Sequence, residues 1–123
     1  MSKKILIVDD EPHMLRVTEL SLKKGGYQIL TARNGREAIA FAERELPALI
    51  VMDVLMPELD GLAALKQLKG TPATAGIPVI MLTSHGQTVA RDAAATSGAA
   101  LYVTKPFSPS ALAAEARRII GEP

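Results

Sequence analysis

The chain has 123 residues, 48% of them hydrophobic and 22% charged, which is the size and composition of one globular domain. A formal net charge of +1 excludes a strong bulk attraction to nucleic acid or to an acidic membrane, and the absence of cysteine excludes disulfides, thiolate catalysis and cysteine-based metal sites. The first apolar run meets acidic residues after four positions, so it is neither a signal peptide nor a spanning helix. We therefore expect a cytoplasmic protein without membrane insertion.

Apolar runs and helical periodicity alternate along the chain. The runs predict strands at residues 5–8, 27–32, 48–53, 78–83 and 100–104. Helical spacing of apolar residues predicts helices at 12–24, 36–46, 61–69, 87–97 and 109–120. Because strand and helix alternate with short connections, we expect an α/β fold: a doubly wound parallel sheet of five strands flanked by five helices.

The same spacing predicts which helical side chains face the core. In the first helix, Leu20 falls outside the apolar face and is expected to be exposed. The second helix is expected to turn Ala38, Ile39, Ala42 and Leu46 inward.

Polar residues stand at the ends of four expected strands. Asp9 and Asp10 follow the first strand, Asp53 ends the third, Thr83 ends the fourth and Lys105 follows the fifth. In an open parallel sheet these ends meet at one edge, where such folds build their sites. Three carboxylates there would repel one another unless a cation intervened, and Mg²⁺ binds through carboxylates together with phosphate oxygens. Beside that ion, the ammonium and the hydroxyl suit a transferring phosphoryl group, and the remaining carboxylate could attack it to form an aspartyl phosphate.

These motifs also carry a resemblance to a known family. They are Asp9-Asp10 after LIV, Asp53 inside VMDVLMPELDG, Thr83-Ser84 after VIML, and Tyr102 followed by Lys105-Pro106-Phe107. Together and in this order they make the chain similar to a two-component response regulator receiver domain of the chemotaxis type, over nearly its whole length. The resemblance implies a flavodoxin-like fold with strand order 2-1-3-4-5 and a single receiver domain over residues 1–123, with no output domain in this chain.

The resemblance also implies a phosphorylation site. Asp53 would accept a phosphoryl group from a histidine kinase or a histidine phosphotransfer protein. Mg²⁺ would be held by Asp10, Asp53 and the backbone carbonyl of Leu55, with Asp9 helping through a water molecule. Lys105 would pair with the phosphoryl oxygens.

A switch is implied as well. Thr83 would reach for the phosphoryl oxygen, and Tyr102 would turn inward into the space that Thr83 leaves. The face formed by the fourth helix, the fifth strand and the fifth helix would then bind a downstream protein target. Our hypothesis is that Leu55 and His85, which flank the expected phosphoryl pocket, set the lifetime of the phosphorylated state.

The chain departs from many receivers at one place. It has Ala100-Leu101 where an acidic pair often precedes the switch tyrosine, and this removes charges that the DNA-binding class uses to dimerise. We therefore expect a monomer that makes no direct contact with nucleic acid.

Other functions and simpler interpretations stay open. An aspartate-nucleophile phosphatase of the haloacid dehalogenase type would need a second aspartate at the position of Leu55, so we expect no enzyme beyond the chain's own phosphorylation and dephosphorylation. The alternative is a receiver-like interaction module that is never phosphorylated. Taken singly, Asp9-Asp10 could cap the first helix, and Tyr102 could be an ordinary half-buried strand aromatic.

Overall fold

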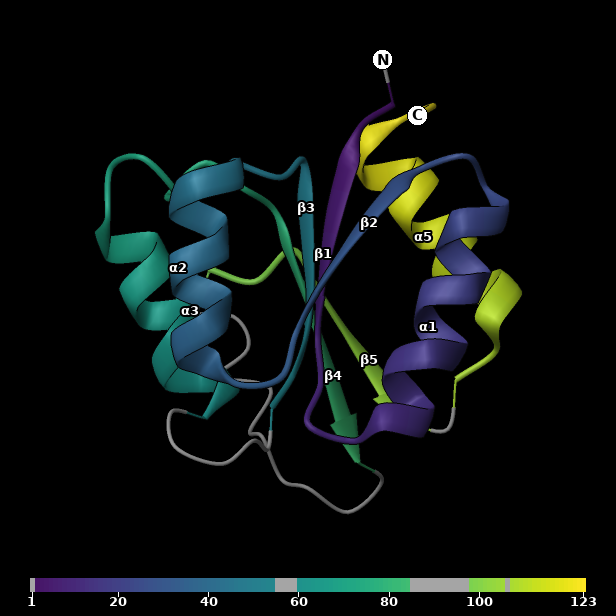
Figure 1. Cartoon of the computed structure of the whole chain (residues 1–123), viewed down its shortest axis with the longest axis horizontal. Helices are drawn as coiled ribbons and strands as arrows, with labels where there is room; N and C mark the ends of the chain where they lie inside the picture. Colours follow the sequence, from purple (N-terminus) through teal and green to yellow (C-terminus); the bar gives the residue numbers. More distant parts are fainter. Residues whose placement is uncertain (1, 55–59, 85–97, 106) are drawn as a thin grey trace.

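The computed structural model describes residues 2–54, 60–84, 98–105 and 107–123. Its elements are, in order, β1 (Lys4–Val8), α1 (Pro12–Lys24), β2 (Gln28–Ala32), α2 (Gly35–Glu45), β3 (Leu49–Asp53), α3 (Gly61–Gly70), β4 (Val79–Ser84), β5 (Leu101–Lys105) and α5 (Pro109–Ile120). All neighbouring strands pair in parallel, in the order β2-β1-β3-β4-β5 (Figure 1), which confirms the expected sheet. The helix expected at residues 87–97 lies outside the described residues.

The sheet is covered on both faces, by α2 and α3 on one side and by α1 and α5 on the other (Figure 1). Each central strand contributes side chains to the core on both faces of the sheet. In β1, Leu6 and Val8 pack in the cluster under α2 and α3, whereas Ile5 and Ile7 pack in the cluster under α1 and α5. Successive strand residues point to opposite faces, so a strand covered twice must be apolar at every position. This double coverage is the physical reason for the unbroken apolar runs.

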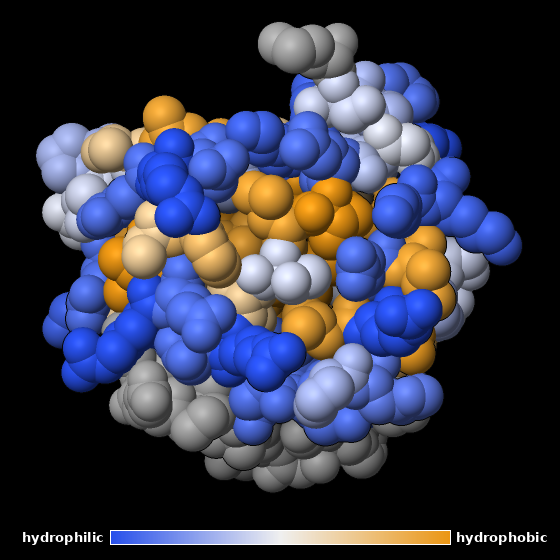
Figure 2. All heavy atoms as spheres, in the orientation of Figure 1, coloured by the Kyte–Doolittle hydropathy of each residue, from blue (hydrophilic) through white to orange (hydrophobic). Residues whose placement is uncertain are grey.

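The edge strand β2 is less covered than the central strands. Ile29 and Leu30 are only half-buried. Figure 2 shows apolar surface in the middle of the face where β2 lies, with hydrophilic side chains over the helices on either side. Leu20 on α1 is 55% exposed, as its position off the apolar face predicts.

The expected inward orientation of Leu46 is wrong. Ala38 and Ala42 are buried and Ile39 is half-buried, but Leu46 is 56% exposed. The reason is that α2 ends at Glu45 and Leu46 serves as its C-cap, with a left-handed φ of 46°. Its N–H still donates to the carbonyl of Ala42, but the change of backbone conformation takes its side chain off the buried face.

Side-chain caps fix the starts of α2, α3 and α5. The side chains of Asn34, Asp60 and Ser108 accept hydrogen bonds from backbone N–H groups three residues later. Each such cap satisfies one of the free donors at a helix N-terminus.

No helix within the described residues is long and apolar enough to cross a membrane.

Candidate functional site

Three strands deliver charged side chains to the same end of the sheet. Asp53 is the last residue of β3, Lys105 is the last residue of β5, and Asp9 directly follows β1. In each strand the charged residue is an even number of positions from the apolar residues that face α1 and α5, such as Ile7, Val51 and Val103. The strand alternation therefore directs all three toward the same layer.

The charged groups form one compact cluster. Asp9, Asp10 and Asp53 each place a carboxylate oxygen within 4.8 Å of the others. Lys105 Nζ lies 2.9 Å from Asp53 Oδ2 and 3.4 Å from Asp9 Oδ2. Asp9 and Asp53 are 1% and 7% exposed, whereas Asp10 faces solvent. Of the five polar residues expected to converge at this edge, the structure brings these four together.

Burial and charge oppose each other in this cluster. Burial raises the pKa of Asp9, and the nearby carboxylate of Asp53 raises it further, against the hydrogen bond from Glu11 and the charge of Lys105. Burial lowers the pKa of Lys105, but its hydrogen bond to Asp53 and the charges of both aspartates outweigh burial, so the pKa is raised.

The donor set fits a hard divalent cation. Three carboxylates and one ammonium leave a formal charge of −2, counted as −3 plus +1 over the four residues. Carboxylate oxygens on an open, partly exposed edge are the ligands that Mg²⁺ uses, because this ion keeps several of its waters. The cluster therefore has both the charge and the ligand type for such an ion.

Capping accounts for only part of this arrangement. Asp9 Oδ1 accepts a hydrogen bond from the Glu11 N–H at 3.0 Å, so Asp9 does satisfy one donor at the start of α1. The N-cap residue itself is Glu11, whose side chain makes no capping bond. Capping does not explain why Asp10 and Asp53 approach the same point.

Thr83 stands at the same carboxyl end of the sheet as the charged cluster, but strand alternation directs Thr83 and Tyr102 toward the layer of α2 and α3. Thr83 is 7% exposed and follows Leu82, the residue that pairs with Asp53 across β3 and β4. Tyr102 pairs with Met81, is half-buried, and packs against the cluster under α2 and α3. Since Thr83 and Met81 are two residues apart, Thr83 and Tyr102 are diagonal neighbours on one face.

The start of α3 packs directly against the end of β3, a contact that the sequence pattern did not indicate. The N–H of Gly61 donates to the carbonyl of Val54 at 2.8 Å. A Cβ atom at Gly61 would lie 2.1 Å from the backbone oxygen of Asp53. Only glycine permits this approach, so residue 61 helps to fix the end of the strand that carries Asp53.

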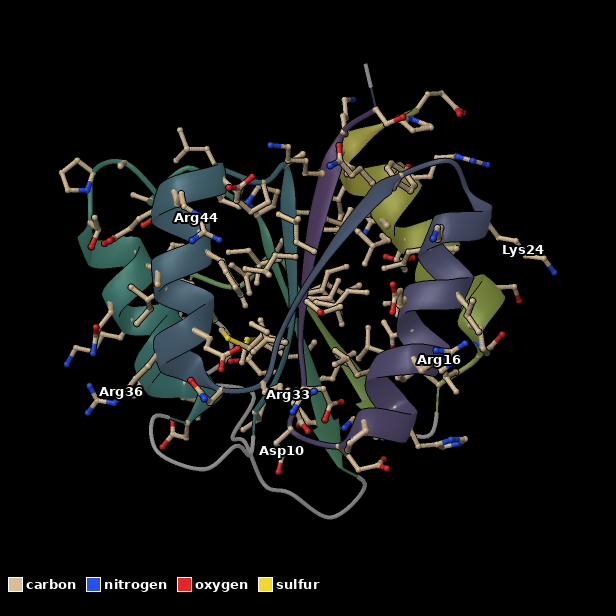
Figure 3. All side chains as sticks on the ribbon, viewed as in Figure 1. Asp10, Arg16, Lys24, Arg33, Arg36 and Arg44 are labelled. Carbon is tan, nitrogen blue, oxygen red and sulfur yellow. The ribbon has the colours of Figure 1, made fainter. Side chains whose placement is uncertain are left out.

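A polar cavity, also absent from the sequence analysis, adjoins the cluster. It measures about 260 Å³, and its walls include Asp9, Asp10, Arg16 and Arg33. In Figure 3, Arg16 extends from α1, and Arg33 lies with Asp10 at the carboxyl edge of the sheet. The two arginines come from different elements, so no local motif joins them. Leu55, His85 and Pro106 lie outside the described residues.

Comparison with known proteins agrees with this architecture. Residues 5–117 match the family model described as the response regulator receiver domain. The chain belongs to the response regulator receiver domain family. It is therefore a receiver of two-component signal transduction, and its strand order is the one that the resemblance implied.

Solved receivers share the fold closely. The chemotaxis response regulator CheY4 of Vibrio cholerae superposes with a TM-score of 0.88 at 29% identity, covering 97% of this chain and 99% of CheY4. The receiver domain of a sensor histidine kinase from Pseudomonas aeruginosa superposes with a TM-score of 0.89 at 30% identity, covering 99% of this chain and all of that one. That structure is described with a magnesium ion coordinated in its active-site cleft.

Curated relatives are longer than this receiver. The alkaline phosphatase synthesis transcriptional regulatory protein PhoP of Bacillus subtilis is 40% identical over 120 residues, which are 98% of this chain but 49% of PhoP. The chain spans about half the length of the curated relatives that it matches.

Proposed function

We propose that this receiver accepts a phosphoryl group on Asp53 from a histidine kinase or a histidine phosphotransfer protein. The observation that carries the proposal is the position of Lys105 Nζ, 2.9 Å from Asp53 Oδ2 within a cluster of three carboxylates. An Asp53 oxygen attacks phosphorus, the bond from phosphorus to the donor nitrogen breaks, and the imidazole leaves. The chain acts only on itself and turns over no other substrate.

Asp9, Asp10 and Asp53 would hold Mg²⁺, with the backbone carbonyl of Leu55 as a further ligand. The ion, when bound, neutralises charge on the phosphoryl oxygens and on the cluster. Asp10 faces solvent and suits direct ligation, whereas the buried Asp9, already bonded to Glu11 and Lys105, suits contact through a water molecule. The magnesium described in the Pseudomonas receiver supports this assignment.

Lys105 and Thr83 complete the site. Lys105 stands beside the acceptor carboxylate and pairs with the phosphoryl oxygens that replace its present partners. Thr83, buried one residue beyond the partner of Asp53, supplies a hydroxyl to the same oxygens.

The output is a two-state change that starts at Thr83. Movement of Thr83 toward the phosphoryl group vacates space on the face that it shares with Tyr102, and the tyrosine turns into it. The changed face of the expected fourth helix, β5 and α5 binds a downstream protein, with the receiver acting as a monomer and without direct contact to nucleic acid. Leu55 and His85 set the lifetime of the phosphorylated state.

Intact-mass spectrometry after incubation with a small phosphodonor tests the proposal. The native chain should gain one phosphoryl group with Mg²⁺ and none with a chelator. Asp53→Asn should gain none. The matched control is Asp60→Asn, which alters an acid outside the cluster and keeps a side-chain oxygen to cap α3.

The alternative function, an interaction module that is never phosphorylated, makes a different prediction. Under it the native chain gains no phosphoryl group with any donor, even where titration shows that Mg²⁺ binds. That result would overturn the phosphoacceptor role of Asp53.

A further inference from the structure

The peptide unit that joins Asp53 to Val54 is held from two sides. On one side its N–H, which belongs to Val54, donates to the carbonyl of Leu82 on β4 at 2.9 Å. On the other side the start of α3 lies against its carbonyl group, and the N–H of Gly61 donates to the next carbonyl, that of Val54, at 2.8 Å. The backbone that carries the acceptor is therefore fixed between β4 and α3.

Gly61 sets how closely α3 approaches this peptide unit. A Cβ atom at residue 61 would lie 2.1 Å from the backbone oxygen of Asp53, 3.0 Å from its carbonyl carbon and 2.9 Å from the Cα atom of Val54. All three are backbone atoms, so no side-chain rotation could relieve the overlap. A larger residue would have to displace either the peptide unit or the first turn of α3.

Backbone conformation is not the reason for a glycine at this position. Gly61 is the first residue of α3, and its φ is not positive, unlike those of Gly26, Gly98 and Gly121. Replacing a glycine of ordinary φ by alanine usually stabilises a protein, because the unfolded chain loses freedom. What requires glycine at residue 61 is therefore the lack of space beside the acceptor.

The contact reaches the groups of the proposed reaction through the backbone. Displacing the peptide unit after Asp53 moves its carboxylate, which lies 2.9 Å from Lys105 Nζ and within 4.8 Å of two other carboxylates. The carbonyl that accepts from Gly61 belongs to Val54, and the next residue is Leu55, whose carbonyl is the further metal ligand of the proposed function. Reactions between positioned groups are sensitive to displacements of about 1 Å.

We propose that Gly61 is a positioning residue for Mg²⁺ binding, and so for phosphoryl acceptance, and that it acts through the peptide unit between Asp53 and Val54. The inference rests on the proposed function, in which Asp53 is both the acceptor and a metal ligand. Gly61 contributes only its backbone. The absence of a side chain lets α3 close on the end of β3, and this keeps the Asp53 carboxylate in reach of Lys105 and of the other acids.

Gly61→Ala adds one methyl group and tests this role. The matched control is Gly70→Ala, at the other end of the same helix, where an added Cβ would meet nothing within 4 Å. For Gly61→Ala we expect Mg²⁺ binding to weaken about tenfold, measured on the unphosphorylated chain from the midpoint at which Mg²⁺ shifts the backbone amide resonance of Asp10. At saturating Mg²⁺, the rate of phosphorylation by phosphoramidate should fall about 100-fold, measured by intact mass. Gly70→Ala should match the native chain in both.

A general loss of stability is separated from this role by a second control. The melting temperature in a chelator shows how far Gly61→Ala destabilises the fold, and the Mg²⁺ titrations are made well below that temperature. Tyr27→Phe removes a hydrogen bond at the amino end of the sheet. This variant should lose stability and keep the native Mg²⁺ affinity.

The native chain allows a measurement without any substitution. The N–H of Gly61 donates to the carbonyl that follows the acceptor peptide, so Mg²⁺ should shift the Gly61 amide resonance with the same midpoint as that of Asp10. The amide resonance of Gly70 should not move. This measurement decides the proposal if Gly61→Ala does not fold.

Two results would overturn the proposal. One is a folded Gly61→Ala variant with native Mg²⁺ affinity, whatever its melting temperature, because Gly61 would then serve packing alone. The other is a Gly61 resonance in the native chain that Mg²⁺ does not move. Failure of the proposed function looks different: the native chain would bind Mg²⁺ and gain no phosphoryl group, while the weaker binding to Gly61→Ala would still support the place of Gly61 at the metal site.

Discussion

The two ends of the sheet treat charge in opposite ways. At the amino end, polar groups pair within the chain: Lys4 pairs with Glu45 at 3.1 Å, the Tyr27 hydroxyl donates to the carbonyl of Gly121, and Lys3 donates to that of Ile120. At the carboxyl end, three acids lie together and Lys105 pairs with two of them, Asp9 and Asp53. The first end pairs its polar groups within the chain, whereas the second carries an excess of negative charge that suits a cation. The contrast places the excess negative charge at the end of the sheet that carries Asp53.

Removing the lysine that pairs with Asp9 and Asp53 should have the largest effect. Lys105→Ala takes away the group that faces the phosphoryl oxygens, so we expect the phosphorylation rate to fall about 100-fold to 1000-fold, as for other preorganised transition-state donors. Mass spectrometry over time measures the rate. Mg²⁺ affinity should be retained or increased, because the metal loses a competing cation. A rate within threefold of native would show that Lys105 is only structural.

Asp9→Asn should stabilise the metal-free protein, by about 1 kcal/mol, in the range of other single charge optimisations. Asparagine keeps the oxygen that accepts from Glu11 and removes a buried negative charge. The pKa of Asp9 is raised in the folded state, so folding favours its protonated form. The native chain therefore loses stability relative to the variant as the pH rises from the unfolded pKa, about 3.9, through the raised folded value.

Thermal unfolding in a chelator, from pH 4 to pH 7, measures this difference. The gap in melting temperature between Asp9→Asn and the native chain should widen with pH and then level off. Adding Mg²⁺ should narrow it, since the ion stabilises the native chain by mass action. A gap that shrinks with rising pH would show that the charge of Asp9 is stabilising.

At the amino end, the same kind of experiment should affect stability alone. Tyr27→Phe removes the hydroxyl that donates to Gly121 and should cost about 1 kcal/mol of unfolding free energy, the net value of one hydrogen bond. Denaturant unfolding measures the loss. Phosphorylation should proceed at the native rate, and a slower rate would mean that the two ends are coupled.

Lys4→Ala should have the smallest effect. The Lys4 side chain is 37% exposed and its ion pair with Glu45 lies at the surface, where such pairs contribute little. We expect a melting temperature and a phosphorylation rate that match those of the native chain. A clear loss of stability would show that the amino end depends on charge pairs more than on hydrogen bonds.

Much of the fold was predictable because strands that are buried on both faces appear in the sequence as unbroken apolar runs. Runs such as LIVM in β3 must be apolar throughout when α-helices cover both sides, and the polar residues that follow them then mark the edge where side chains converge. Leu46 was predicted wrongly because helical periodicity does not show where a helix stops. A single left-handed residue ended the pattern one position early.

The less predictable parts of the site depend on contacts between elements. Arg16 and Arg33 are ordinary surface arginines in the sequence, and only the packing of α1 beside the end of β2 gives them a common cavity. The contact of Gly61 with Asp53 likewise depends on how α3 meets β3. By contrast, Asp9, Asp53 and Lys105 were identified together because each one ends or directly follows a strand of the same parallel sheet.

Because Gly61 lies so close to Asp53, the glycines of α3 and the following loop differ in whether they can be replaced by a larger residue. An added methyl group at residue 61 would press on the backbone of the acceptor, while at Gly70 and Gly76 it would meet nothing within 4 Å. A designer who wishes to rigidify this receiver could substitute the latter two freely. Gly61 cannot be substituted in this way, because any side chain there would displace the backbone of Asp53. It is therefore needed for the position of the acceptor, although it has no side chain to take part in the chemistry.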